Sequence, residues 1–161
     1  MAEHTFISKL EPHWAEKKFV CVGLDSDASK LPPHLKTQFP NVTDQMFEFN
    51  KAIIDATADL VCAYKPNIAF YEAQGAAGIE ALRKTVQYLK ENHSGIPVIL
   101  DAKRADIGST NDGYVTAYFD QIGVDAITVH PYLGKEAMQP FLDRKEKGII
   151  VLARTSNPGA G

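Results

Sequence analysis

The chain has 161 residues, enough for a single domain with a sizeable hydrophobic core, and we expect one domain over residues 1–161. Its formal net charge is −3, with 45% hydrophobic and 23% charged residues, which is typical of a globular protein and lacks the basic surplus of a nucleic-acid-binding protein. No apolar run approaches the roughly 20 residues of a membrane-spanning helix, and the first 18 residues lack a signal-peptide core, so we expect a cytoplasmic protein.

Amphipathic and apolar stretches alternate along the chain. Residues 1–17 predict a short helix. The apolar residues on its expected face are Phe6, Ile7, Leu10 and Trp14. Apolar runs typical of buried strands occupy residues 19–24, 60–64, 96–100, 126–129 and 149–153. Stretches with helical spacing occupy residues 43–54 (capped by Thr43 or Asp44), 72–92, 110–123 and 135–145.

The remaining segments are interpreted more simply. Residues 26–40 contain three prolines and predict a loop with at most a turn of helix. Gly75 and Gly78 lie in the first turns of the helix expected over 72–92, where close helix packing explains them better than a phosphate-binding loop, because they match neither phosphate-loop motif. Cys21 and Cys62 lie in apolar runs and predict reduced core residues.

Continuous apolar strands separated by helices indicate an α/β fold with a parallel sheet covered on both faces. Each expected strand ends at polar residues, which are Asp25, Lys65, Asp101 with Lys103, His130 and Ser156. A (β/α)8 barrel builds its active site at such strand ends, and an open doubly wound sheet also binds ligands at that edge. A succession of polar strand ends therefore indicates a functional site.

The segment from Asp101 to Asp106 is the most informative. Side chains alternate along a strand, so Asp101 and Lys103 point the same way, and Asp106 follows where the chain turns toward a helix. Two carboxylates then flank one ammonium group and keep it charged. Such a lysine can donate a proton beside fixed negative charge. The alternative interpretation of these three residues alone is a surface salt-bridge cluster.

Five segments together resemble the orotidine 5'-phosphate decarboxylase family, in particular its bacterial subgroup with longer chains. The segments are Gly23-Leu24-Asp25, Tyr64-Lys65-Pro66-Asn67 with Phe70-Tyr71-Glu72, Asp101-Ala102-Lys103-Arg104-Ala105-Asp106-Ile107 with Thr110, Val129-His130-Pro131-Tyr132, and Thr155-Ser156-Asn157-Pro158-Gly159. The resemblance runs from about residue 18 to residue 161. It implies an enzyme of pyrimidine biosynthesis that converts orotidine 5'-monophosphate to uridine 5'-monophosphate without a metal or cofactor.

The resemblance also implies roles for single residues. Asp25 and Lys65 would hold the ribose hydroxyls of the substrate. Asp101, Lys103 and Asp106 would form a charged array with Lys65. Lys103 would protonate C6 of the pyrimidine ring as carbon dioxide leaves. An ammonium group fixed at C6 stabilises the transition state more than the ground state, which is the condition for catalysis.

Further implied roles concern binding and assembly. Ser156 would contact the pyrimidine ring. In the family, the residues that match Asp106, Ile107 and Thr110 reach into the neighbouring subunit's site, so the resemblance implies a homodimer with shared active sites.

A (β/α)8 barrel needs about 200 residues or more, whereas this sequence carries about the first five βα units. In the family, a glutamine on a mobile loop and an arginine, contributed after the seventh and eighth strands, hold the substrate phosphate. Neither region is present. We therefore expect an incomplete barrel, the N-terminal portion of a longer enzyme, that is inactive alone.

Three rival functions stay open. The first is a magnesium-dependent 3-keto-gulonate 6-phosphate decarboxylase or its hexulose-phosphate synthase relative, although a lysine at position 65 disfavours a divalent cation. The second is a Schiff-base aldolase that uses Lys65 or Lys103. The third is a half-barrel fragment that acts only as an interaction module. His130 is equally consistent with a hydrogen-bonded strand-end histidine and with a residue lining the site.

Overall fold

A computed structural model of the chain describes residues 5–159. Its strands, in chain order, are β1 (Val20–Gly23), β2 (Val61–Lys65), β3 (Ile99–Arg104), β4 (Ala126–Val129) and β5 (Gly148–Val151). Parallel ladders join β1 to β2 and join β3, β4 and β5, while parallel bridges from Tyr64 to Val98 and from Asn67 to Asp101 connect β2 with β3. The spatial order therefore follows the sequence, as in a (β/α)8 barrel and unlike a doubly wound sheet, where the order reverses.

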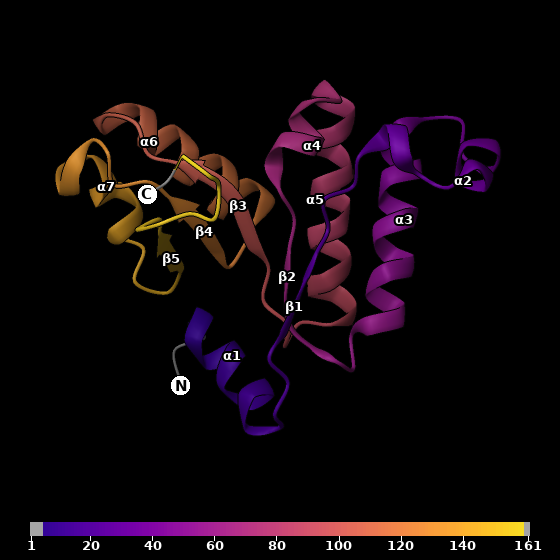
Figure 1. Cartoon of the computed structure of the whole chain (residues 1–161), viewed down its shortest axis with the longest axis horizontal. Coiled ribbons are helices and arrows are strands. Elements are labelled where there is room, and N and C mark those ends of the chain that lie inside the picture. Colours follow the sequence, from indigo (N-terminus) through magenta and orange to yellow (C-terminus); the bar gives the residue numbers. More distant parts are fainter. Residues whose placement is uncertain (1–4, 160–161) are drawn as a thin grey trace.

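Helical segments connect these strands. They are α1 (Phe6–Ala15), η1 (Ala28–Lys30), α2 (Pro33–Gln38), α3 (Val42–Thr57), α4 (Ile68–Glu72), α5 (Gly75–Asn92), α6 (Gly108–Val115), η2 (Thr116–Ile122) and α7 (Gly134–Leu142). Figure 1 shows α3 and α5 on one side of the strands and α6 and α7 on the other. Helix α1 lies at the end opposite α4 and α6, where Lys9 forms a 2.7 Å ion pair with Asp125 at the start of β4.

Several boundaries differ from those expected. Residues 26–40 form η1 and α2 instead of a loop with a single turn. The cap of α3 is Asn41, whose side chain accepts a hydrogen bond from the Asp44 backbone N–H at 2.9 Å, and not Thr43 or Asp44. The strand expected at 96–100 begins at Ile99 and continues to Arg104, so the charged segment lies on the strand itself.

The helix expected over 72–92 is divided into α4 and α5. Gly75 adopts a φ of +59°, a left-handed conformation that only glycine takes readily, and this turn separates the two helices. Gly78 lies on α5 against α4, and a Cβ atom added there would collide with the carbonyl oxygen of Tyr71. The expectation of close packing is therefore confirmed for Gly78 and wrong for Gly75, where an added Cβ atom would meet nothing within 4 Å.

The core lies between the sheet and α3, α4, α5, α6, η2 and α7. Its largest fully buried side chains are Tyr64, Tyr71, Phe141, Leu24, Met46, Ile54, Leu82, Leu89, Leu100, Ile127, Val61 and Val86. A buried polar network crosses it. Asn50 contacts Ser26 and donates hydrogen bonds to Thr85 (2.9 Å) and Tyr71 (3.0 Å), and the Tyr71 hydroxyl donates to the Leu24 carbonyl (2.8 Å). Burial, only partly offset by the hydrogen bonds from Asn50 and Ser26, raises the pKa of Tyr71 to about 12.

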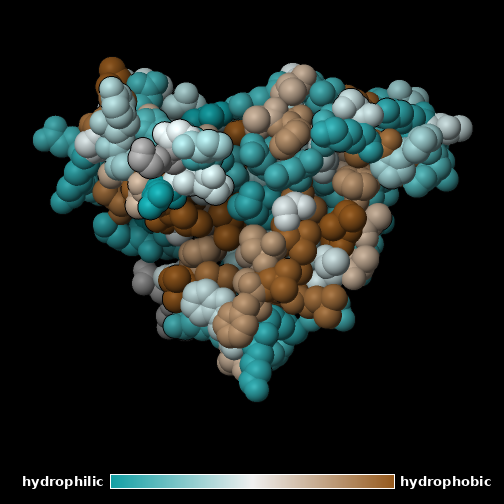
Figure 2. Space-filling model, viewed as in Figure 1, coloured by the Kyte–Doolittle hydropathy of each residue, from teal (hydrophilic) through white to brown (hydrophobic). Residues whose placement is uncertain are grey.

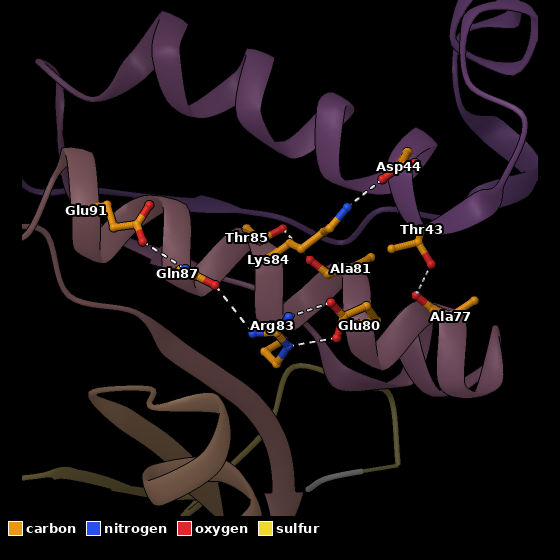
Figure 3. Close-up of polar contacts among 10 residues, drawn as sticks. All are labelled: Thr43, Asp44, Ala77, Glu80, Ala81, Arg83, Lys84, Thr85, Gln87 and Glu91. Carbon is orange, nitrogen blue, oxygen red and sulfur yellow. Dashed lines mark hydrogen bonds and ion pairs between the residues drawn. The ribbon is translucent and has the colours of Figure 1, made fainter.

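Polar contacts between α3 and α5 support this packing (Figure 3). The Thr43 hydroxyl donates to the Ala77 carbonyl at 2.9 Å, and Lys84 forms a 2.6 Å ion pair with Asp44. The first contact joins the N-terminal turns of the two helices, and the second joins the N-terminal turn of α3 to the middle of α5.

The two ends of the strand order are open. In the described residues β1 pairs only with β2 and β5 only with β4. Large apolar side chains on or next to β1 and β5 are exposed, namely Phe19, Val20, Ile150 and Val151. In the view of Figure 2, hydrophobic residues gather in the middle of the molecule, between the two groups of helices. The expectation of strands covered on both faces therefore fails at β1 and β5.

Two further expectations are corrected. Cys21 is an exposed residue on β1, whereas Cys62 on β2 is buried as expected. On α1, Phe6 and Leu10 are buried, but Ile7 and Trp14 are exposed because the helix contacts the sheet with only part of its apolar face. Within the described residues, no helix combines the length and the apolar character needed to cross a membrane.

Candidate active site

The charged residues at the carboxyl ends of β2 and β3 form one cluster. Lys65 is the last residue of β2, and Asp101 and Lys103 lie on β3. The Asp101 Oδ2 atom lies 3.4 Å from the Lys65 Nζ atom, and Asp101 Oδ1 lies 2.6 Å from Lys103 Nζ. One carboxylate thus bridges two ammonium groups, as the strand-end pattern predicted.

The environment of Asp101 favours its charged form. Its side chain is 12% exposed, and this burial opposes ionisation. Hydrogen bonds from Lys103 and Thr128 and the positive charges of Lys65 and Lys103 outweigh the burial, so the pKa of Asp101 is lowered. Lys103 is 51% exposed and is paired with this anchored carboxylate. The cluster therefore presents a fixed ammonium group beside a fixed negative charge.

Strand alternation alone does not describe the backbone conformation in which Lys103 reaches Asp101. Its φ is +48°, in the left-handed region that L-residues rarely adopt, and Ala105 also has a positive φ of 149°. The β3–β4 register shifts between Leu100 and Arg104, so the strand bulges where it carries the charges. Bulges next to active sites commonly redirect a side chain.

Thr128 on β4 lies opposite this bulge and was not singled out in the sequence. Its Oγ1 atom accepts hydrogen bonds from the backbone N–H groups of Ala102 (3.0 Å) and Lys103 (2.9 Å) and donates one to Asp101 Oδ1 (2.9 Å). The only signal in the sequence was a hydroxyl residue inside an otherwise apolar strand.

Asp106 is not part of the ion-pair cluster, contrary to the expectation of one four-residue array within the chain. Its Oδ1 atom accepts the backbone N–H of Ile107 at 2.7 Å, and its own backbone N–H donates to Asn111 at 2.7 Å. The cause is the turn from β3 into α6, which directs Asp106 back onto its own loop. Ile107 (66% exposed) and Thr110 also lie at the exposed start of α6.

Asp25 follows β1 and lines a cavity of about 150 Å³ together with Ser26, Lys30 and Phe70. The backbone N–H of Leu24 donates to the Lys65 carbonyl at 3.1 Å, which places Asp25 directly beside the β2 end of the cluster.

Ser156 and His130 follow the last two strands. Ser156 is exposed in the segment after β5, and no contact in residues 5–159 joins it to the cluster. The backbone N–H of His130 donates to the Arg104 carbonyl at 2.8 Å. Within the described residues the His130 Nδ1 atom is buried without a hydrogen-bond partner. Asn67 caps α4 by accepting the Ala69 N–H at 3.1 Å.

Arg104 connects the end of β3 to α4, α6 and η2. It forms an ion pair with Glu72, donates to the Tyr118 hydroxyl at 3.2 Å, and lies over the stacked rings of Tyr114 and Tyr118. Tyr114 and Tyr118 thus pack against each other and against the Arg104 guanidinium group. In the described part of the chain, no three His, Cys, Asp or Glu side chains are grouped so that they could hold a metal ion.

Curated proteins and solved structures resemble this chain in sequence and in fold. Orotidine 5'-phosphate decarboxylase of Herpetosiphon aurantiacus is 53% identical over 145 residues, covering 90% of this chain and 52% of the relative. The Thermomicrobium roseum enzyme of the same name is 52% identical over 157 residues, covering 97% of this chain and 53% of the relative. The chain therefore spans about half the length of the curated relatives it matches.

Solved structures agree with the sequence comparison. The structure of Leishmania donovani OMP decarboxylase matches with a TM-score of 0.81 and 37% identity, over 96% of this chain and 56% of that chain. Leishmania donovani UMP synthase matches with a TM-score of 0.83 and 38% identity, over 97% of this chain and 32% of that one. The strand order and these matches show that the chain has the first five βα units of a (β/α)8 barrel.

The family model covers both the charged cluster and the strands that carry it. It is described as the orotidine 5'-phosphate decarboxylase / HUMPS family, and it matches residues 18–161, from the start of β1 through the segment after β5. With this match and relatives about half identical, the chain belongs to the orotidine 5'-phosphate decarboxylase / HUMPS family.

Proposed function

We propose that this chain provides the proton donor and the charged array for decarboxylation of orotidine 5'-monophosphate to uridine 5'-monophosphate, a step of pyrimidine biosynthesis. The observation that carries the proposal is the alternation of Lys65, Asp101 and Lys103 at adjoining strand ends, within 3.4 Å and 2.6 Å of one another. The names of relatives that are about half identical support it.

The chemistry follows from the charges. As the bond between C6 and the carboxyl carbon breaks, its electron pair stays on C6 and carbon dioxide leaves. The Lys103 ammonium group stabilises that developing charge and then transfers a proton to C6, which completes uridine 5'-monophosphate. Because the Asp101–Lys103 pair exists before substrate binds, it needs no reorganisation during the reaction.

Substrate binding is assigned to the surrounding strand ends. Asp25 and Lys65 would hold the ribose hydroxyls, and Ser156 would contact the pyrimidine ring. The position of Asp25 beside the end of β2 and the exposure of Ser156 are compatible with these roles.

We also propose a cytoplasmic homodimer with shared active sites. Asp106, Ile107 and Thr110 would then reach the neighbouring subunit's site. The exposure of Ile107 and Thr110 at the start of α6 supports this arrangement.

The test is turnover of orotidine 5'-monophosphate, followed by its ultraviolet absorbance, with the chain co-expressed with the C-terminal half of the Herpetosiphon aurantiacus relative. We expect Lys103→Ala to lower kcat by about 10³-fold or more, because general-acid and electrostatic contributions are lost together. Binding of uridine 5'-monophosphate should persist.

Lys145→Ala is the matched control, since Lys145 lies in the loop before β5, at the opposite end of the strands. It should leave kcat unchanged. Full turnover by Lys103→Ala would overturn the proposal. Activity that disappears with a chelator and returns with Mg²⁺ would favour the magnesium-dependent branch.

A further inference from the structure

We propose that Thr128 is a positioning residue for this chemistry, one that holds both Asp101 and the backbone of Lys103 in their reactive arrangement. The inference rests on the proposed function for its catalytic consequence, but its structural basis is independent of the substrate. Thr128 lies on β4, between β3 and β5, and is 7% exposed.

The first argument is the gap in the β3–β4 ladder. Leu100 pairs with Ile127 and Arg104 pairs with Val129, so the three residues from Asp101 to Lys103 lie opposite the single residue Thr128. A bulge of this kind leaves backbone N–H groups without ladder partners. Unpaired N–H groups in a nearly buried position are costly, so another acceptor is required.

The second argument is that the Thr128 hydroxyl meets this requirement completely. A hydroxyl has two acceptor lone pairs and one donor hydrogen. Its lone pairs accept the N–H groups of Ala102 and Lys103, at 3.0 and 2.9 Å, and its hydrogen is donated to Asp101 Oδ1 at 2.9 Å. All three capacities of the hydroxyl are therefore used on the segment that carries the charges.

The third argument is the conformation that these bonds stabilise. Lys103 has a φ of +48°, a strained conformation that a non-glycine residue keeps only where its surroundings compensate. The bond from its N–H group to Thr128 is such a compensation. The same bulge returns the Lys103 ammonium to Asp101 Oδ1, the atom that also accepts the Thr128 hydroxyl. Thr128 thus fixes the backbone and the carboxylate that together orient Lys103.

Thr128→Val and Thr128→Ser separate the hydroxyl from the shape of the side chain. Valine keeps a branched side chain of similar size but offers no acceptor or donor, whereas serine keeps the hydroxyl. We expect Thr128→Val to lower kcat about 10- to 100-fold, the scale of effect for a displaced catalytic group, with KM changed less than about threefold. Thr128→Ser should keep kcat within about threefold of the unsubstituted enzyme.

A second readout does not depend on turnover. Removing the Thr128 donor should raise the pKa of Asp101 in Thr128→Val and not in Thr128→Ser, as measured from the ¹³C shift of the Asp101 carboxyl group across a pH titration. Hydrogen exchange of the Ala102 and Lys103 amides should accelerate in Thr128→Val only. In the unsubstituted protein both amides should exchange slowly, which tests the acceptor role even if Thr128→Val does not fold.

All variants are compared in the chain co-expressed with the C-terminal half of the Herpetosiphon aurantiacus relative. Thr85→Val is the matched control, because Thr85 is a buried threonine in the network between α3 and α5, away from the cluster. It should reduce stability and leave kcat and the Asp101 titration unchanged.

The outcomes distinguish the two proposals. Unchanged kcat in Thr128→Val, equal losses in the Ser and Val variants, or rapid exchange of both amides in the unsubstituted protein would overturn the role of Thr128. An unsubstituted protein without orotidylate turnover would overturn the proposed function, while the titration and exchange measurements would still decide the positioning role.

Discussion

Asp101 is the residue on which the charges of the cluster converge. Its two oxygens receive Lys65, Lys103 and the Thr128 hydroxyl, so three donors depend on one carboxylate. Removing the negative charge would leave two ammonium groups close together without the ion that separates them. The carboxylate is therefore a structural requirement of the cluster as well as a part of the proposed chemistry.

This dependence predicts a specific effect of pH on stability. The pKa of Asp101 is lowered in the folded state, so its ionisation stabilises the fold above the ordinary aspartate pKa, and that stabilisation is lost as the pH falls through the lower folded-state value. We expect Asp101→Asn to cost about 2 kcal/mol of unfolding free energy near pH 7, the scale of a hydrogen bond to a charged group. The difference from the unsubstituted protein should shrink below about pH 4, close to the ordinary aspartate value.

Urea unfolding at a series of pH values, with the barrel completed as above, measures this difference. Asp112→Asn on the exposed side of α6 serves as the control. A difference in unfolding free energy that stays the same between about pH 3 and pH 7, the range in which aspartates titrate, would contradict the assignment.

At the residue scale, the sequence predicted the contacts of Lys65 and Lys103 with Asp101 but not the backbone conformation that allows them. Strand alternation correctly placed Asp101 and Lys103 on the same side. It could not predict the left-handed Lys103 or the shift in register, because these depend on the neighbouring strand and on the Thr128 hydroxyl. Asp106 was wrongly placed in the same ion-pair array, because spacing alone does not show that a turn directs its carboxylate onto its own backbone.

At the scale of elements, helical periodicity gave the helices but not their divisions. The separation of α4 from α5 depends on a single left-handed glycine, Gly75, within an otherwise continuous helical pattern. Similarly, the helix after the charged segment changes from α6 to the π-helical η2 at Thr116, although its apolar spacing continues. It ends at Gly123, whose φ of +83° confirms the expected end.

The contact between α4 and α5 predicts a sharp difference between two glycines. Gly78→Ala would push a methyl group into the Tyr71 carbonyl, so we expect a loss of about 1–3 kcal/mol, as for other overpacked sites. Gly113→Ala on α6 has open space around the new methyl group and should gain up to about 1 kcal/mol through helix propensity. Urea unfolding of the two variants measures the contrast, and equal effects would show that the α4–α5 contact is looser than described.

At the scale of the whole molecule, the open strand order decides how the chain behaves alone. Strands β1 and β5 carry exposed large apolar residues beside strand edges that are open in the described part of the chain. Exposed edges of this kind favour aggregation. The chain also spans about half of its relatives' length, so a complete barrel wall requires further strands.

We therefore expect the 161-residue chain expressed alone to be poorly soluble or aggregated and inactive on orotidine 5'-monophosphate. Co-expression with a fragment that supplies the remaining βα units should restore both solubility and turnover, because it covers both edges and brings the region that we expect to hold the phosphate. Size-exclusion chromatography and the absorbance assay, with and without the fragment, measure these outcomes. A stable and active species formed by the chain alone would contradict this view of the fold.

The central place of β3 has a consequence for recombination between related genes. The charged cluster is carried by β2, β3 and β4. These strands precede β5 in the sequence, so the contacts described for the cluster all lie before a sequence boundary drawn after β5. A crossover at that boundary would exchange barrel halves between relatives and transmit the cluster as one inherited block. A crossover between β2 and β3 would instead separate Lys65 from Asp101, and the chimera would bring together partners that had not been selected together.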